Sequence, residues 1–491
     1  MTRKHLAISV PLVVIATSFL FAQNPPPQSM LARITSHREV NGAWDDDQIH
    51  TMNRIRDAAL RDPYAYDQLS WLSNNIGARP SGSPQLEAAI QRVAAQLRSL
   101  GAEVTLEKTT IPHWVRGEET AALTEWTGMT PGTTQRIVVT ALGSSPSTPL
   151  TGLVAPVVVI DSFDQLMAQP AGSLKGKIVL FNHPFDKELA AAGHAIDAYA
   201  QGAVYRGAGP SAASRLGAAA AIVRSVGGED LRLPHTGSTI FEKDVTPIPA
   251  AAVTAEDADL IASLSKQGPV VMRLTLTPRN LPPVSGYNVI ADWKGSQHPD
   301  QIVLVSGHLD SWDPGTGALD DGSGVVMGME TIQLMKMLNL HPRRTIRFVA
   351  WMNEELGASG AATYLADHAA EMTNHIAAIE NDRGADHPFG IIFNGPAALA
   401  DYLAPVARTL DPIGANLVLH EQEIGEDVAG MMAEGVPGIC SAQDMRTYFN
   451  YHHSAADTLD KVDRRQLAEN AAVTSVVAFA LADAEEPAPR K

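Results

Sequence analysis

The sequence predicts an α/β protein with a mixed, largely parallel central sheet flanked by helices, and a β-rich segment inserted into it. Two observations predict this architecture. After residue 283, strand-like runs alternate with helix-like runs, which is typical of a parallel sheet covered by helices on both faces. Between residues 112 and 282, short β-like runs are separated by Gly, Pro and Ser, which indicates a separate module.

Composition supports a globular chain and excludes some partners. Of its 491 residues, 45% are hydrophobic and 19% charged, so the chain can bury a large core. Its 37 Lys and Arg against 54 Asp and Glu give a formal charge of −17, without a basic cluster to offset it. This balance excludes an electrostatic surface for nucleic acid or for anionic membranes. The single cysteine, Cys440, has apolar neighbours and is expected to be buried and structural.

Residues 1–22 are predicted to be a signal peptide. Arg3 and Lys4 precede an apolar run over residues 6–21, and Ala22 suits a cleavage site. The run is short for a membrane span, and the prolines at positions 25–27 would end any helix. We therefore expect export to the periplasm or the extracellular medium after cleavage, without a membrane anchor.

The first elements of the mature chain are a helix and a strand. Ser83 and Pro84 are typical of a helix start, apolar residues then recur at helical spacing, and Gly101 is typical of a helix end. Residues 104–111 alternate loosely and predict a strand. In the inserted segment, residues 215–223 predict an Ala-rich helix running into a strand. The other strand-like runs there are residues 137–140, 157–160, 177–181, 249–253 and 270–275.

After residue 283 the alternation of strands and helices resumes. Strands are expected at residues 287–293, 301–306 and 345–351, and helices at residues 325–338 and 359–368. Ligand sites in such sheets lie at the carboxyl ends of the strands. The residues that directly follow these strands are therefore the candidates for chemistry.

The strand at 301–306 leads to His308 and Asp310. A histidine that binds a metal usually donates its other ring N–H to an oxygen, which fixes the tautomer. The spacing therefore suggests His308 as a ligand and Asp310 as the residue that orients it. Taken alone, a histidine after a strand is more often structural.

The sequence contains two pairs of adjacent carboxylates beside glycines, one pair before a predicted helix and the other after a predicted strand. Asp320 and Asp321 could cap the following helix, or one could bridge two divalent cations whose charge removes the repulsion between the acids. Glu354 and Glu355 follow the strand at 345–351. They could start a solvated helix, or one could bind metal while the other acts as a general base.

Two further candidates come from later in the chain. Asp382 follows the short apolar run at 377–379, and the pair His452 and His453 lies near the C-terminus. Nitrogen and oxygen ligands without a thiolate form a set expected for zinc. The full set of predicted ligands is His308, Asp320, Glu355, Asp382 and His453.

Four motifs carry a resemblance to a known family. They are Gly-Ala-Arg-Pro-Ser-Gly-Ser at 77–83, Ile-Pro-His-Trp-Val-Arg-Gly-Glu-Glu at 111–119, Ser-Gly-His-Leu-Asp-Ser-Trp-Asp at 306–313 and His-His-Ser at 452–454. Through them the sequence resembles the carboxypeptidase Q family of cocatalytic di-zinc exopeptidases, over almost the whole mature chain. The inserted segment resembles a protease-associated domain, with residues 176–179 as its recurring strand.

The resemblance implies a zinc-exopeptidase fold and a role for each site residue. Asp320 would bridge two zinc ions, with His308 and Asp382 completing one site and Glu355 and His453 the other. Glu354 would be the general base for hydrolysis of a peptide bond, and the peptide bond between Asp320 and Asp321 would be cis.

The resemblance also implies a domain organisation and partners. Residues 1–22 would be the signal peptide, 23–112 and 283–491 the two parts of the peptidase domain, and 113–282 the insert. Small peptides, in particular dipeptides, would be the substrates, and the protein would be a homodimer.

Three alternatives remain open. The nearest is an aminopeptidase that acts on longer peptides, and a more distant one is a single-zinc glutaminyl cyclase. The cyclase is disfavoured because all five ligand types and a base are present. A catalytically inactive, receptor-like binding protein on the same scaffold would predict missing ligands.

Overall fold

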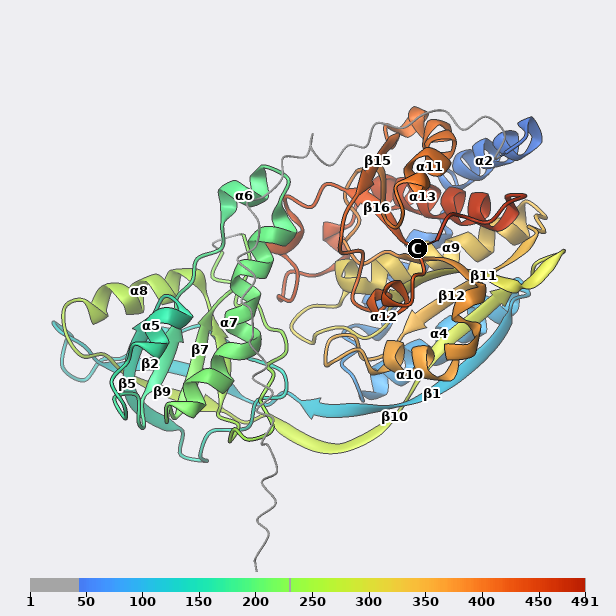
Figure 1. The fold of residues 1–491 in the computed structure, drawn as a ribbon. Helices are drawn as coiled ribbons and strands as arrows, with labels where there is room; N and C mark the ends of the chain where they lie inside the picture. The colour runs from blue at the N-terminus through green and yellow to red at the C-terminus, as the bar shows by residue number, and fades with distance from the viewer. Residues whose placement is uncertain (1–43, 229–230, 491) are drawn as a thin grey trace, which may run out of the picture.

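The structure, a computed structural model, describes residues 44–228 and 231–490 and contains two eight-stranded sheets (Figure 1). The predicted signal peptide at 1–22 lies outside the described residues. Among the residues described, no helix combines the length and apolar character that a bilayer crossing requires.

The first sheet is the mixed sheet expected from the alternating pattern. Its order is β1 (Glu103–Val115), β10 (Arg279–Trp293), β12 (Arg344–Trp351), β11 (His298–His308), β13 (His375–Glu380), β16 (Gly438–Gln443), β14 (Pro388–Asn394) and β15 (Leu417–His420). The central strands β12, β11, β13 and β16 run parallel to one another. The antiparallel pairs join β10 to β1 and β12, and β14 to β16. The predicted mixed α/β fold is confirmed.

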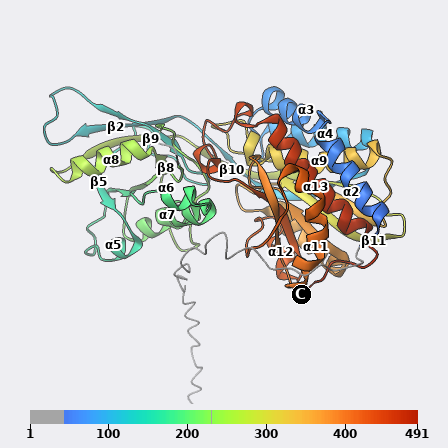
Figure 2. The same cartoon turned by 90° about the horizontal axis from the view of Figure 1, so that it is seen from above.

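Helices cover both faces of this sheet. One face carries α2 (Asp46–Ala59), α3 (Tyr64–Trp71), α4 (Pro84–Leu100), α9 (Ser323–Met337), α11 (Ala398–Thr409) and α13 (Arg464–Asp483), which share the largest apolar core. Figure 2 shows several of these helices side by side. The other face carries α10 (Ser359–Asp367) and α12 (Ala429–Ala433), over a second core that includes the buried Cys440.

Burial raises the pKa of the Cys440 thiol to about 12, which fits the expected structural role.

The first predicted helix has the expected ends. The Ser83 hydroxyl accepts a hydrogen bond from the backbone N–H of Leu86 at 3.1 Å, which caps α4. Gly101 ends the helix in the left-handed conformation, at φ 100°. The predicted helix start and end are therefore both confirmed.

The second sheet is formed by residues that lie between β1 and β10 in the sequence. These two strands form the long antiparallel pair that connects the two parts of the molecule (Figure 1). We call residues 116–278 the insert. Its sheet order is β3 (Gln135–Ile137), β2 (Glu119–Glu125), β9 (Val271–Leu276), β5 (Leu153–Ile160), β6 (Ile178–Phe181), β7 (Ala220–Arg224), β8 (Ala250–Val253) and β4 (Val139–Ala141). Its helices are α5 (Phe163–Met167), α6 (Lys187–Ala191), α7 (Ala195–Arg215) and α8 (Ala255–Ser265).

The insert is richer in helix than its sequence pattern suggested. Each predicted strand overlaps an observed one, including the strand into which residues 215–223 were expected to run, but the helix expected in that range is wrong. The long helix α7 ends at Arg215, and Gly217 at φ 85° turns the chain into β7. The alanines after Gly217 favour a helix by their intrinsic propensity, but here they lead into β7, which pairs with β6 within the sheet.

Short helical turns complete the first part of the molecule. They are the π turns η1 (Leu72–Ile76) and η2 (Ala318–Gly322) and the 3₁₀ turns η3 (Ala369–Asn374), η4 (Asp411–Ile413), η5 (Tyr448–Asn450) and η6 (Leu459–Lys461). Of these, η2 contains Asp320, and η5 shortly precedes His452 and His453.

A buried ion pair links β10 to β12. The Arg347 guanidinium donates to both oxygens of Asp292, at 2.7 and 2.9 Å, and Lys294 donates to the same carboxylate at 2.7 Å. Burial alone would raise the pKa of Asp292, but Arg347 and Lys294 hold it below the ordinary value. The paired carboxylate therefore stabilises the folded state wherever it is ionised.

Replacing Asp292 with Asn is expected to reduce the free energy of unfolding at pH 7 by about 1.5–3 kcal/mol, the typical contribution of a hydrogen bond to a charged group. The pKa of Asp292 is lower in the folded than in the unfolded chain. Its contribution is thus complete above about pH 4 and disappears as the pH falls through the folded-state pKa. Urea unfolding of both proteins at pH 7 and pH 3 tests this. An equal difference at both pH values would contradict it.

Candidate metal centre

The predicted site residues that follow strands meet at one edge of the central sheet. His308 is the last residue of β11, Glu354 and Glu355 follow β12, and Asp382 follows β13. Because β12, β11 and β13 are parallel neighbours, their carboxyl ends lie together. The topology therefore gathers side chains that are up to 74 residues apart in sequence.

Asp320 lies in the turn η2, in front of these strand ends. The peptide bond between Asp320 and Asp321 is cis, as the family resemblance implied. The Asp457 carboxylate accepts hydrogen bonds from the backbone N–H groups of Ala318, Leu319 and Asp320, at 3.0, 2.7 and 3.3 Å. These bonds fix the backbone that presents the Asp320 side chain.

The Asp320 carboxylate lies between two groups of ligand atoms. Its Oδ1 is 3.1 Å from Nε2 of His308, and that nitrogen is 3.8 Å from Oδ1 of Asp382. Its Oδ2 is 3.2 Å from Nε2 of His453, and that nitrogen is 3.0 Å from Oε2 of Glu355. The five predicted ligands therefore converge, with one oxygen of Asp320 facing each group.

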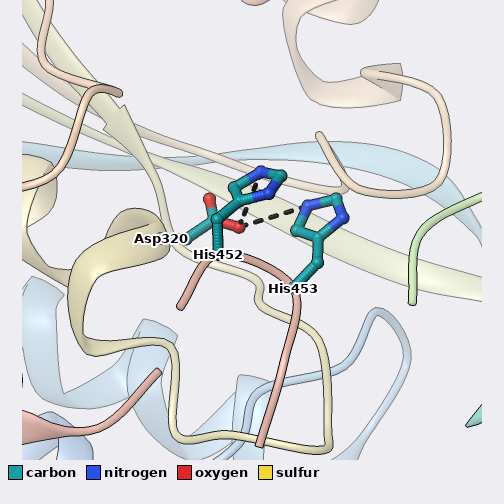
Figure 3. Close-up of side chains that lie close together, drawn as sticks. All are labelled: Asp320, His452 and His453. Atoms are coloured by element: carbon teal, nitrogen blue, oxygen red, sulfur yellow. Dashed lines mark ion pairs between the residues drawn. The ribbon is translucent and has the colours of Figure 1, made fainter. Parts of the chain in front are cut away.

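His452 also approaches Asp320 (Figure 3). Its Nε2 lies 3.5 Å from Oδ2 of Asp320, and its ring stacks on that of His453 with centroids 3.6 Å apart. Burial lowers the pKa of His452 well below the ordinary value, and the positive charge of the neighbouring His453 lowers it further. His453 contacts both Asp320 and Glu355, which favours it over His452 as the ligand shared with Glu355.

Asp310 has a different role from the one its spacing suggested. Nδ1 of His308 lies 3.0 Å from the backbone carbonyl oxygen of Asp310, whereas the nearest carboxylate oxygen is 3.9 Å away. The Asp310 carboxylate instead accepts hydrogen bonds from the Ser81 hydroxyl at 2.9 Å and from the Glu354 backbone N–H at 3.1 Å. The carbonyl of Asp310 therefore orients His308, and its side chain positions the Glu354–Glu355 turn.

Glu354 lies beside the ligands without belonging to either group around Asp320. Ligand atoms of His308, Glu354 and Glu355 all lie within 4.8 Å of one another. Burial raises the pKa of Glu354 well above the ordinary value, and the negative charges of Glu355 and Asp382 raise it further. A carboxylate with a raised pKa that faces this centre is suited to accept a proton and return it.

The buried carboxyl groups of the centre lie so close together that a bound cation would stabilise their ionised forms. Burial raises the pKa of Glu355 to about 7 and that of Asp382 to about 6, and Asp320 contributes to both shifts. Oε1 of Glu355 is buried without a hydrogen-bond partner among the described residues. Imidazole nitrogens and carboxylate oxygens without a thiolate suit a divalent metal such as zinc. The donor set thus fits two divalent cations that share Asp320.

The sequence did not indicate the residues outside the ligand set that fix the loops carrying the ligands. Arg79, fully buried, donates to the carbonyl oxygens of Leu309, Thr316 and Gly317, at 2.7, 2.8 and 2.8 Å. It thereby ties the loop after β11 to the turn before Asp320. Arg79 and Ser81 lie in the motif at 77–83, so the motif was the available signal, although their contacts depend on the fold.

Comparisons with known proteins agree with this geometry. The family model described as Peptidase family M28 matches residues 288–478. Carboxypeptidase Q of Homo sapiens is 38% identical over 428 residues, which are 87% of this chain and 87% of that protein. The predicted resemblance to carboxypeptidase Q is therefore confirmed.

Solved structures show the same relationship. The peptidase M28 precursor from Shewanella amazonensis SB2B is 37% identical, with a TM-score of 0.84 over 91% of this chain and 100% of that chain. A zinc aminopeptidase from Bacillus subtilis shares the fold at 21% identity, with a TM-score of 0.61 over 87% of this chain and 98% of that chain. Together, these findings show that the chain belongs to peptidase family M28 and is a metallopeptidase similar to carboxypeptidase Q.

Proposed function

We propose that the protein is an exported zinc-dependent exopeptidase that hydrolyses dipeptides or other short peptides with two zinc ions per chain. The observation that carries this proposal is the Asp320 carboxylate, whose two oxygens face Nε2 of His308 and Nε2 of His453, at 3.1 and 3.2 Å. A carboxylate between two imidazoles, each with a further carboxylate beside it, has the donor pattern of a bridged pair of ions.

Each ion would have its own ligands besides Asp320. His308 and Asp382 would hold the first ion, and Glu355 and His453 the second. When bound, such ions polarise the scissile carbonyl and acidify the attacking water.

The chain's own groups would move the proton. Glu354 would take it from the attacking water and return it to the leaving amine, and its raised pKa suits both steps. The carbonyl of Asp310 would hold His308 in the tautomer whose Nε2 is free to bind, and the Asp310 carboxylate would hold the backbone of Glu354.

The names of the relatives support an exopeptidase but leave its end preference between two classes. One relative is named a carboxypeptidase, and the structural neighbour from Bacillus subtilis is an aminopeptidase. We favour the carboxypeptidase Q class because its similarity extends over 87% of the chain at 38% identity. An aminopeptidase on longer peptides is the second candidate.

A screen of short peptides with free or blocked ends tests this proposal. We expect hydrolysis of unblocked dipeptides that stops in the presence of a chelator and returns when zinc is added. Cleavage that tolerates a blocked carboxyl end but not a blocked amine would favour the aminopeptidase instead. A purified protein that binds zinc but cleaves none of these peptides would contradict the exopeptidase proposal.

Zinc affinity is expected to fall as the pH falls from 8 to 5. In the metal-free protein, Glu355 and Asp382 have pKa values of about 7 and about 6, so protons compete with zinc over this range. Each displaced proton weakens the apparent affinity by roughly tenfold per pH unit below its pKa. Isothermal titration calorimetry in buffers of different ionisation enthalpy measures the released protons. An affinity independent of pH would contradict these ligand assignments.

The remaining features of the proposal concern location and assembly. We propose cleavage after residue 22, a peptidase domain formed by residues 23–112 and 283–491, a protease-associated domain at 113–282 that includes the insert, and a homodimer. N-terminal sequencing of the exported protein tests the cleavage site, and light scattering of the purified protein tests the dimer. An intact N-terminus or a monomeric mass would contradict the corresponding feature.

A further inference from the structure

The insert makes direct hydrogen bonds to the loop that carries His453. The Thr236 backbone N–H donates to the carbonyl oxygen of His453 at 2.8 Å, and the Thr236 carbonyl lies 3.3 Å from Nδ1 of the His453 ring. One residue earlier in the insert, Nδ1 of His235 lies 2.7 Å from the carbonyl oxygen of His452. Two consecutive residues of the insert therefore contact two consecutive residues of the metal centre.

The contact with Thr236 favours one tautomer of the His453 ring. A backbone carbonyl can only accept a hydrogen bond, so the Thr236 carbonyl, at 3.3 Å, favours a proton on Nδ1 of His453. The Arg206 guanidinium, which can only donate, lies farther from this nitrogen, at 3.5 Å. In the neutral ring, Nε2 then has the free lone pair, and it is Nε2 that faces Asp320 and Glu355. The insert thus selects the tautomer that a metal ligand requires.

The backbone of His453 needs external support. Its φ is 59°, in the left-handed region that residues with a Cβ rarely adopt. Such a conformation persists only where surrounding contacts enforce it. The bonds from Thr236 to both the carbonyl and the ring of His453 provide such contacts.

Arg206 of α7 reinforces this arrangement. Its Nη1 donates to the same Thr236 carbonyl at 3.4 Å and lies 3.5 Å from Nδ1 of His453, and its Nη2 donates to the Tyr199 hydroxyl at 2.6 Å. Gly237 allows the close approach, because a Cβ there would lie 2.4 Å from Nε of Arg206. Arg206 therefore fixes the carbonyl that orients His453.

A second arginine docks this part of the insert onto the strand-end loops. Arg116 donates to Asp313 at 2.7 Å, to the carbonyl of Ala141 at 2.8 Å and to the Thr236 hydroxyl at 3.2 Å. Asp313 belongs to the same motif as His308, so one guanidinium joins the metal-binding motif to the segment that holds His453. Arg116 and Asp313 are motif residues to which the proposed hydrolysis assigns no role.

We propose that the insert completes the second metal site: Arg206 and the His235–Thr236 segment act as positioning elements that hold His453 in the orientation and tautomer that the second ion requires. This inference rests on the proposed two-ion function. It predicts that changes in the insert weaken the second ion, the one held by Glu355 and His453, and leave the first ion unaffected.

The test is a titration of the full-length metal-free enzyme with zinc against a chromophoric chelator. Arg206→Met removes the guanidinium and keeps the stem, and His235→Leu removes the donor to His452 at similar volume. Arg206→Lys and His235→Asn are the conservative partners, since each retains a donor. Arg215→Met is the matched control, because Arg215 lies on the same helix but pairs with Asp244 and Glu242. Arg206→Met, at a half-buried position, carries the test by itself if His235→Leu does not fold.

We expect two ions in the wild type, and one of them bound 10–100-fold more weakly in Arg206→Met and His235→Leu, the usual effect of removing support from a ligand. Arg206→Lys and His235→Asn should recover part of this loss, and Arg215→Met should bind both ions normally. The absorption of the cobalt-substituted protein identifies the weakened ion by comparison with His453→Ala. Adding Arg206→Met to His453→Ala should cause no further loss, because both changes act on the same ion.

Two results would overturn the inference while leaving the proposed function intact. In the first, the wild type binds two ions, and the insert variants bind both of them as tightly as the wild type does. The second is an equal weakening of both ions, which would mean that the insert stabilises the whole fold. A wild type that binds fewer than two ions would instead overturn the proposed function, and this inference with it.

Discussion

Replacing Glu354 with Gln is expected to lower kcat by about 10²–10⁴-fold, the usual contribution of a general base, while zinc content stays at the wild-type level. The amide cannot take a proton from water, yet it has nearly the same size and shape as the carboxylate. Glu354 lies beside the ligand atoms of His308 and Glu355 but is not part of either ligand group around Asp320. Its loss should therefore affect the proton transfer rather than the metal.

Glu355→Gln is the matched comparison for this variant, because it makes the same chemical change one residue later. Oε2 of Glu355 lies 3.0 Å from Nε2 of His453, so this variant is expected to lose the second ion. Metal analysis and steady-state kinetics of both variants separate the two roles. Loss of zinc from Glu354→Gln, with retention in Glu355→Gln, would show that base and ligand are exchanged.

Asp320→Asn is expected to have the largest effect on the metal centre, because both proposed sites share this carboxylate. The amide removes the negative charge between His308 and His453. It leaves only its carbonyl oxygen as a possible metal ligand. Both ions should bind weakly, and kcat/KM should fall by about 10³-fold or more, as expected when the several kcal/mol that the metals contribute to the transition state are lost. Zinc analysis after dialysis and peptide hydrolysis at saturating zinc measure the two effects.

Asp321→Asn is the control for this change. The Asp321 carboxylate accepts hydrogen bonds from the backbone N–H groups of His308 and Gly324, both at 3.0 Å, and so supports the turn. This variant is expected to unfold at a lower temperature but to retain both ions. If Asp320→Asn kept its full zinc content, the bridging role of Asp320 would be wrong.

The central part of the site could be predicted from the sequence because parallel strands place their carboxyl ends together. His308 ends a strand of this group, and Asp382, Glu354 and Glu355 follow strands of it. A run of apolar residues followed by a polar one is visible in the sequence, and the topology then fixes where the polar residue lies. The helix α4 was equally predictable, because its capping residues Ser83 and Gly101 act locally.

The support of the site could not be predicted, because it depends on contacts between distant segments. Asp457 holds the backbone of Asp320 from 137 residues away, and Thr236 contacts His453 from 217 residues away. Neither contact leaves a local pattern in the sequence. The role expected of Asp310 illustrates the same limit, because spacing could not distinguish its carboxylate from its carbonyl.

The two-ion centre can be observed directly in a crystal structure of the zinc-loaded protein with anomalous data collected at the zinc edge. We expect two anomalous peaks, one on each side of the Asp320 carboxylate: the first beside His308 and Asp382, the second beside Glu355 and His453. A single peak, or a second peak held by His452 without Glu355, would contradict this expectation.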